Sequence, residues 1–311
     1  MSTQPKPQFA EVDSAVQPMI SLVIANVGGP SAGTGTAAKR KKDIAGFLHK
    51  FQPNIVLLQE FSWVGITGPA WKNVSIPDKY EYTGNNEASI LYDKNEFIIE
   101  IPSLTEMEKL LDEMIRKGKL PMGFTPISRM CTRVIKTKGL PNLKFICVSW
   151  HGRYKGKKMS NLVDELKQLL LFLQTYSDKK GLPFIVAGDY NIPYEEAKIH
   201  VNTPLVIYQY QPLKRREGKV IDFFIGSELL PLDNMSAIDW RTVEGAEDAY
   251  KIFDHDPIYG VIRRFPRSKT RQAPKPVASV QQNVTQRVVL RKSKTLTREK
   301  QSHKKSNCVV Q

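Results

Sequence analysis

The chain has 311 residues, 41% of them hydrophobic and 9% aromatic, which is enough for one large core or two modest ones. Its longest early apolar run, 19–27, is shorter than the ~18 residues of a membrane span and follows no basic region, so we expect neither a membrane-spanning nor a secreted protein. Cys131, Cys147 and Cys308 show no metal-ligand spacing and are too few for a disulfide framework, which fits a reducing cytosolic compartment.

The net charge of +15 is concentrated at one end of the chain. Residues 266–311 hold twelve Lys or Arg and one acid, which leaves a net charge of +4 for everything before them. We therefore expect a polar disordered segment at 1–17, one folded domain at 18–265 and a basic disordered tail at 266–311. The high pI belongs mainly to the tail and says little about the surface of the folded domain.

Strands and helices alternate along the predicted domain. A Gly-rich stretch at 28–36 lacks the Gly-Lys-Ser/Thr ending of a phosphate-binding loop and is expected to be a connector. Residues 61–88 are expected to be rich in loops, and 228–250 irregular. The apolar stripe of 104–115 is interpreted as core packing. In chain order, we expect strands at 21–25, 55–58, 88–92, 97–99, 132–137, 144–150, 184–187, 220–225 and 258–263, and helices at 37–50, 104–115, 160–176 and 193–196.

Polar side chains follow these strands where each one ends. The clearest case is Gly188-Asp189-Tyr190-Asn191, in which two side chains separated by one residue point to the same side of an extended segment. Asp222 lies inside an apolar strand, and a buried acid needs a partner. Taken singly, each residue could be a loop or turn residue. The strand-end set is Asn26, Glu60, His151, Asp189, Asn191, Asp222, Asp254 and His255.

In this order the set resembles the endonuclease/exonuclease/phosphatase superfamily, the DNase I-like metal-dependent phosphoesterases. The resemblance covers about residues 18–265. It implies an α/β (α+β) fold, a four-layer α/β/β/α sandwich in which two facing sheets carry helices outside and one active site lies at the sheet ends. The matching pieces are 24–26, 57–60, 148–151, 188–191, 220–223 and 254–257.

The resemblance also implies roles for the polar residues. Glu60 would be the main ligand of a catalytic Mg²⁺, with Mn²⁺ as the alternative ion, and Asn26 and Asp254 would lie beside it. Hard carboxylate and amide oxygens suit such an ion. The remaining residues fall into two expected groups. Catalytic roles are implied for His151, Asp189, Asn191, Asp222 and His255; candidate phosphate contacts are Arg129, Arg133 and Tyr154, with Asn161 as an alternative to Tyr154.

The predicted reaction is the hydrolysis of a phosphoester. Phosphoinositide 5-phosphatases of the superfamily carry a Trp two residues before the Gly-Asp-any-Asn pattern, where this chain has Val186. They also carry a Trp/Cys-Asp-Arg pattern near the Asp222 position, where this chain has 220–223. The large Phe253 also departs from the family's usual small residue before Asp-His. We therefore expect a nuclease or phosphodiesterase acting on DNA or RNA; the alternatives are an enzyme acting on a phosphoinositide or other phospholipid, and a catalytically inactive membrane-bound scaffold.

The final residues, Cys308-Val309-Val310-Gln311, match a prenylation signal whose last residue favours farnesyl. A lipid together with a polybasic stretch anchors a protein stably to an anionic membrane. We expect modification of Cys308 by a prenyltransferase and a monomeric enzyme at the cytosolic face of a membrane. The alternatives are a tail that grips nucleic acid and a nuclear location.

Overall fold

A computed structural model describes residues 19–28, 34–61, 75–139, 142–153, 158–210, 220–245, 253 and 255–263, with the side chains of 34–38 excluded. The chain divides into two units, Met1–Arg267 and Ser268–Gln311, and all of the second unit lies outside the described residues. Cys308 is therefore among the residues about which the structure gives no information. No helix within the described ranges is long and apolar enough to cross a membrane.

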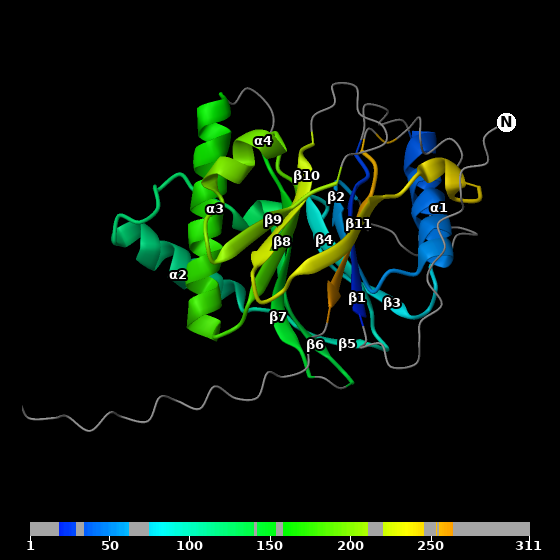
Figure 1. Ribbon diagram of the computed structural model, residues 1–311, viewed down its shortest axis with the longest axis horizontal. Coiled ribbons are helices and arrows are strands. Elements are labelled where there is room, and N and C mark those ends of the chain that lie inside the picture. The colour runs from blue at the N-terminus through cyan, green and yellow to red at the C-terminus, as the bar shows by residue number, and fades with distance from the viewer. Residues whose placement is uncertain are drawn as a thin grey trace, which may run out of the picture. The chain divides into compact units, whose positions relative to one another are not determined.

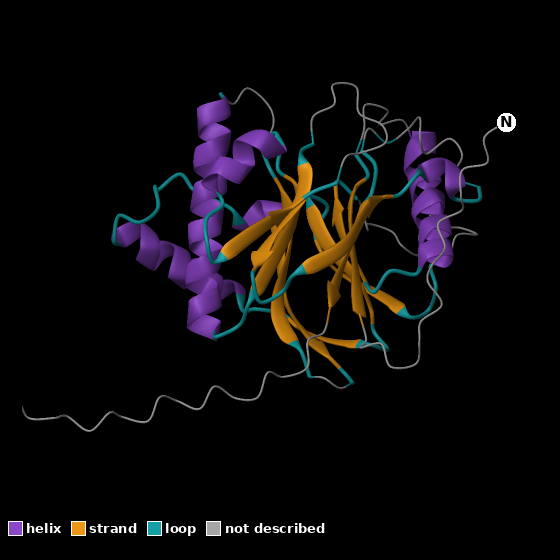
Figure 2. Ribbon diagram, in the orientation of Figure 1, coloured by secondary structure: helices purple, strands orange, loops and turns teal. Residues whose placement is uncertain are grey.

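Two six-stranded sheets form the centre of the described part of the chain (Figure 2). Only β1/β2 and β7/β8 pair in parallel there; the other strand pairs are antiparallel. In spatial order, the first sheet contains β11 (Leu232–Ala237), β12 (Ile258–Arg263), β1 (Met19–Asn26), β2 (Ile55–Gln59), β4 (Ala88–Asp93) and β3 (Tyr80–Gly84). The second contains β5 (Phe97–Glu100), β6 (Met130–Thr137), β7 (Lys144–His151), β8 (Phe184–Asp189), β10 (Asp222–Ser227) and β9 (Leu205–Tyr208).

Helices lie on the outer face of each sheet. Figure 1 shows α1 (Thr34–Phe51) on one side of the sheet pair and α2 (Leu104–Arg116) and α3 (Met159–Lys180) on the other. This arrangement confirms the predicted four-layer α/β/β/α sandwich. The short helical elements among the described residues are α4 (Tyr194–Ala197) and the 3₁₀ turns Ile127–Arg129, Lys198–His200 and Trp240–Thr242.

Three apolar clusters hold the layers together, and the alternation of each strand divides its side chains between two of them. In β1, Leu22 and Ile24 face the cluster between the sheets, whereas Val23 and Ala25 face the cluster beneath α1. Both faces of each sheet are thus buried, which explains the nearly continuous apolar runs of the central strands. The third cluster joins the second sheet to α2 and α3 and includes Leu110. The interpretation of the 104–115 stripe as core packing is confirmed.

Three strands were absent from the prediction, and all three lie at or next to sheet edges. β3 falls in the region expected to be loops, and β11 makes the expectation of an irregular 228–250 wrong at Leu232–Ala237. β9 was not predicted either. These strands expose much of their length, and the sequences of β3 and β11 carry polar residues in place of a buried apolar run, whereas β9 is a short run of four apolar residues. The predicted helix 160–176 extends to Lys180 and ends at Gly181, whose left-handed backbone (φ 63°) terminates it.

Candidate active site

Parallel strand pairs from both sheets end at the same edge of the sandwich. In the first sheet, Asn26 lies opposite Gln59, and Glu60 follows directly. In the second sheet, His151 lies opposite Asp189 at the ends of β7 and β8. Because parallel strands end on the same side, the topology places side chains from both sheets around one site. The sequence placed these residues at strand ends, and the structure brings them together.

Two further residues enter the site from antiparallel strands. Asp222 is the first residue of β10 and pairs with Asp189 across the ladder. His255 lies just before β12, and the indole Nε1 of Trp240 donates a hydrogen bond to its carbonyl oxygen at 3.3 Å. Phe253 is buried against Trp240, with ring centroids 4.8 Å apart, so the large residue that departs from the family pattern supports the turn that carries His255.

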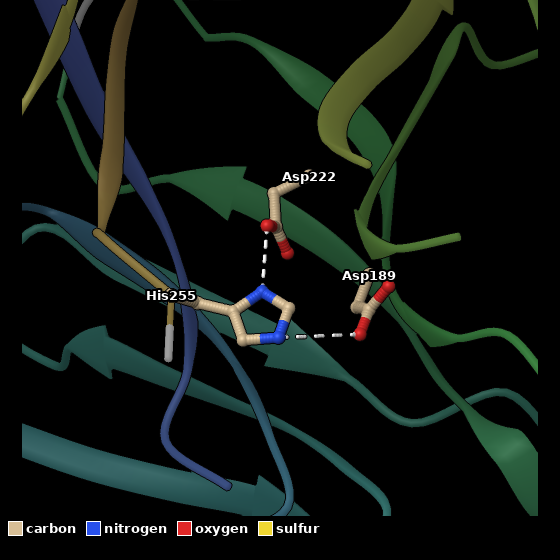
Figure 3. A group of neighbouring side chains, drawn as sticks. All are labelled: Asp189, Asp222 and His255. Atoms are coloured by element: carbon tan, nitrogen blue, oxygen red, sulfur yellow. Dashed lines mark hydrogen bonds and ion pairs between the residues drawn. The ribbon is translucent and has the colours of Figure 1, made fainter. Parts of the chain in front are cut away.

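Asp222, His255 and Asp189 form a compact cluster, in which the imidazole lies between the two carboxylates (Figure 3). The Nδ1 atom of His255 is 2.7 Å from Oδ2 of Asp222, and its Nε2 atom is 3.8 Å from Oδ2 of Asp189. The short contact fixes the ring and its tautomer, while the longer one exceeds hydrogen-bond distance. Burial raises the pKa of Asp189, and the nearby His255 opposes that rise.

Asn26 connects the carboxylates of the two sheets. Its Nδ2 atom donates to Oδ2 of Asp189 at 3.0 Å and lies 3.4 Å from Oε1 of Glu60. Its Oδ1 atom accepts the backbone N–H of Gly28 at 2.8 Å. Two carboxylates that share one amide group are close enough for mutual repulsion, which a bound cation would relieve.

His151 lies between two acids on the opposite side of the site. Its Nε2 atom is 3.3 Å from Oε1 of Glu60, and its Nδ1 atom is 2.9 Å from Oε2 of Glu87. Glu87 lies in the turn between β3 and β4 and was not among the residues selected from the sequence. Because β3 was not predicted, nothing in the sequence indicated a hairpin turn at Glu87 near the site.

The proton affinities of this group follow from the contacts. Burial disfavours the charged form of His151, but the hydrogen bond that the ring donates to Glu60 and the charges of nearby acids outweigh the effect of burial, so the pKa of His151 is raised. The hydrogen bond from His151 in turn lowers the pKa of Glu60, against the effect of burial. The contact therefore favours an imidazolium on His151 facing a carboxylate on Glu60.

Arg129 contacts the backbone at His151 and Gly152 and the side chain of Glu87. Its Nε atom donates to the carbonyl of His151 at 2.7 Å, and Nη2 donates to the carbonyl of Gly152 at 2.9 Å. Its Nη1 atom is 3.1 Å from Oε2 of Glu87. The guanidinium, predicted as a phosphate contact, thus holds His151 and Glu87 in place, with two of its five N–H groups left for another acceptor.

The turn after β8 has an unusual backbone. Asn191 has φ 54°, and its N–H donates to Oδ1 of Asp189 at 2.8 Å while Nδ2 donates to the carbonyl of Gly152 at 3.0 Å. A Cβ on Gly188 (φ 152°) would lie 1.9 Å from the carbonyl oxygen of Trp150, so only glycine fits. These contacts explain why Gly, Asp and Asn occur at this spacing.

Two of the other predicted residues, Arg133 and Asn161, are not brought to this group. Arg133 lies three residues into β6, where its guanidinium donates to Oγ1 of Thr83 and to the carbonyl of Thr132. Asn161, in the first turn of α3, lines a separate cavity of about 150 Å³ between α3 and the 121–124 loop. Tyr154, Asp254 and Cys308 lie outside the described residues, so their roles stay predictions.

The residues of the site fit a divalent cation. Ligand atoms of Asp189, Asp222 and His255 all lie within 4.8 Å of one another, and Glu60 and Asn26 add hard oxygen atoms beside them. The described site holds four carboxyl groups, two imidazoles and one guanidinium. It therefore stays net negative by one charge even when both histidines are protonated.

Comparison with known proteins supports the fold. No protein-family model matches the chain, and no curated protein matches its sequence. Solved structures do match. A D. rerio TDP2 humanized by 14 mutations has a TM-score of 0.54 and 16% identity over 79% of this chain and 99% of that one. The catalytic domain of human Nocturnin, with bound sulfate, has a TM-score of 0.54 and 16% identity over 79% and 94%.

An endonuclease/exonuclease/phosphatase from Bacteroides vulgatus has a TM-score of 0.55 and 13% identity over 79% of this chain and 99% of that one. Each of these structures is matched over nearly its full length. The chain therefore has the DNase I-like fold of endonuclease/exonuclease/phosphatase proteins, as its strand-end residues predicted.

Proposed function

We propose that the protein is a divalent-metal-dependent phosphoester hydrolase whose substrate is a phosphodiester of DNA or RNA. The observation that carries the proposal is the pairing of each site histidine with its own acid, His255 with Asp222 and His151 with Glu87, around Asp189 and Glu60. Two oriented imidazoles and two further carboxylates supply a phosphate-binding group, a proton acceptor and an ion site within one cluster.

His255 and Asp189 act on one side of the reacting phosphate. Asp222 accepts the Nδ1 proton of His255, so the protonated ring presents Nε2–H to a non-bridging phosphate oxygen. Asp189 faces the same Nε2 atom at 3.8 Å and accepts a proton from the attacking water. Burial raises its pKa, which makes Asp189 a stronger base than an exposed aspartate.

His151 acts from the other side, where Glu87 and Arg129 hold it. Its raised pKa favours the protonated ring, which can donate to a phosphate oxygen or to the leaving group. Glu60 and the Oδ1 atom of Asn26 would hold the cation, which when bound neutralises charge on the phosphoryl oxygens. Asn191 keeps the Asp189 carboxylate oriented through its backbone N–H.

Nucleic acid is favoured as the substrate class by two further observations. D. rerio TDP2, whose fold this chain shares with a TM-score of 0.51, is described in complex with a single-strand DNA product. The sequence lacks the phosphoinositide 5-phosphatase features at Val186 and around Asp222. A small phosphomonoester is the competing class, since a Bacteroides thetaiotaomicron mannosyl-6-phosphatase also has this fold, with a TM-score of 0.51.

An activity panel tests the proposal. Purified full-length protein with Mg²⁺ or Mn²⁺ is assayed on single- and double-stranded DNA, RNA, a phosphoinositide, sphingomyelin and a sugar phosphate. We expect cleavage of a nucleic acid that is lost in Glu60→Ala and Asp189→Ala and retained in Asp233→Asn, an exposed acid paired with Arg263. Equal background activity in wild type and both alanine variants on every substrate would leave the inactive scaffold as the better account.

The predicted lipidation of Cys308 stays a prediction from the sequence, because the tail lies outside the described residues. Mass spectrometry of the full chain purified from eukaryotic cells tests it. A farnesylated Cys308 without the last three residues would support a membrane-tethered enzyme. An unmodified Cys308 with Gln311 retained would exclude the tether.

A further inference from the structure

Gly28 lies directly against the carboxylate of Glu60. If Gly28 carried a Cβ atom, that atom would be 2.2 Å from Oε2, 2.4 Å from Cδ and 2.8 Å from Oε1 of Glu60. Its three nearest neighbours would all be atoms of this one carboxyl group. The volume that any side chain at position 28 would occupy is thus filled by the carboxylate of Glu60.

We propose that Gly28 is a positioning residue for the cation site, because its missing side chain sets where the Glu60 carboxylate lies. The inference rests on the proposed function, in which Glu60 holds the cation. Gly28 itself is fixed by its N–H bond to Oδ1 of Asn26 at 2.8 Å. Asn26 therefore contacts both Glu60 and the glycine that packs against it.

The backbone of Gly28 does not require glycine. Its φ lies outside the left-handed range, in contrast to Gly188, so alanine is sterically allowed there as far as the main chain is concerned. The three nearest atoms belong to the end of a side chain, which can move, and not to the backbone. Alanine at position 28 should therefore leave the fold intact and displace Glu60.

The displacement would be large for a metal ligand. Non-bonded carbon contacts prefer about 3.5 Å, so a methyl group 2.2 Å from Oε2 would push the carboxylate by about 1 Å. Metal–ligand distances tolerate only about 0.2 Å. A shift of this size would also disturb the contacts of the Glu60 carboxylate with His151 and Asn26.

The test is Mn²⁺ binding by full-length protein, measured by calorimetry or electron paramagnetic resonance, together with the Tm of the metal-free protein. We expect Gly28→Ala to bind Mn²⁺ about 10- to 100-fold more weakly, the range for residues that orient metal ligands, while the metal-free protein still unfolds cooperatively with a Tm close to that of the wild type. Gly139→Ala is the matched control, because a Cβ there would meet nothing within 4 Å. In a Glu60→Ala background, Gly28→Ala should cause no further loss of affinity.

The outcomes separate this inference from the proposed function. Failure of the wild type to bind Mn²⁺ would overturn both. Wild-type binding with an unchanged dissociation constant in Gly28→Ala would overturn the role of Gly28 alone. The role of Gly28 would also be overturned if Gly28→Ala weakened Mn²⁺ binding equally with and without Glu60, or if it unfolded the protein. In either case the effect of the substitution would not depend on the position of the Glu60 carboxylate.

Discussion

Replacing Asp222 by asparagine removes the negative charge that His255 faces while keeping the shape of the side chain. In the wild type, Oδ2 of Asp222 is 2.7 Å from Nδ1 of His255, and the two side chains are only 7% and 11% exposed. The contact is a charge-assisted hydrogen bond that solvent screens little. Asparagine can still pair with the ring, but it no longer favours the imidazolium that the proposed mechanism needs.

Hydrogen bonds to charged groups contribute about 1.5–3 kcal/mol. At about 1.36 kcal/mol for each tenfold change in rate, the loss of this bond predicts a fall in kcat of about 10- to 150-fold. The assay is kcat at saturating substrate and Mg²⁺, on the substrate that the activity panel identifies. Asp233→Asn, which removes an exposed carboxylate of the same length from β11, should retain wild-type activity.

A double-mutant cycle makes the test specific. If Asp222 acts only through the ring, adding Asp222→Asn to a His255→Gln variant should cost little further activity, because the group it orients is already missing. A kcat for Asp222→Asn within twofold of wild type would contradict the proposed role of Asp222. So would losses of the two substitutions that multiply in the double variant.

Further predictions concern the backbone and the titration of the site. Gly188→Ala should lower the free energy of unfolding by at least about 3 kcal/mol in denaturant titrations, whereas Gly226→Ala, with neighbours at 3.5 Å, should cost less than about 1 kcal/mol. The raised pKa of His151 means that its pairing stabilises the metal-free protein fully below about pH 6.5 and is lost as the pH rises through the raised value. Because the pKa of Glu60 is lowered, its contacts stabilise the folded protein fully above about pH 4.5, and this stabilisation is lost as the pH falls through the lowered pKa. The Tm of the metal-free protein should therefore be highest between about pH 4.5 and pH 6.5. His151→Gln should weaken the decrease of Tm on the alkaline side of this range. Asn191→Gly should keep both the left-handed turn and the backbone N–H that orients Asp189, so it should retain more activity than Asn191→Ala; an equal loss of activity in the two variants would show that the side-chain amide itself is needed.

The sequence predicted the central strands well because they are buried on both faces. Runs such as 184–187 contain only apolar residues and end in glycine, which leaves little ambiguity about strand or boundary. The edge strands β3 and β11 lack this signal, since exposed edges tolerate polar residues, and the apolar run of β9 is only four residues long. Their positions depend on pairing with distant segments, which local patterns do not encode.

The site divides in the same way. Asn26, Glu60, His151 and Asp189 could be predicted because each directly ends or follows a buried parallel strand. The contribution of Glu87 could not, because its turn reaches the site only through the β3–β4 hairpin at a sheet edge. The contacts by which Arg129 holds His151 and Glu87 in place could not be predicted either, because they join segments that are far apart in the sequence.

The cluster is built from both sheets, so its geometry depends on how the sheets pack. Asn26 and Glu60 come from the first sheet and Asp189 from the second, and the only link between these side chains in the described site is the Asn26 amide. One layer below, the Nε2 atom of Gln59 donates to Oγ of Ser149 at 2.9 Å, and that hydroxyl donates back to the carbonyl of the residue before Gln59 at 3.1 Å. This buried polar link fixes the spacing of the sheets next to the site, whereas apolar contacts alone are non-directional. Gln59 therefore supports the alignment of Glu60 with Asp189 without contacting either carboxylate.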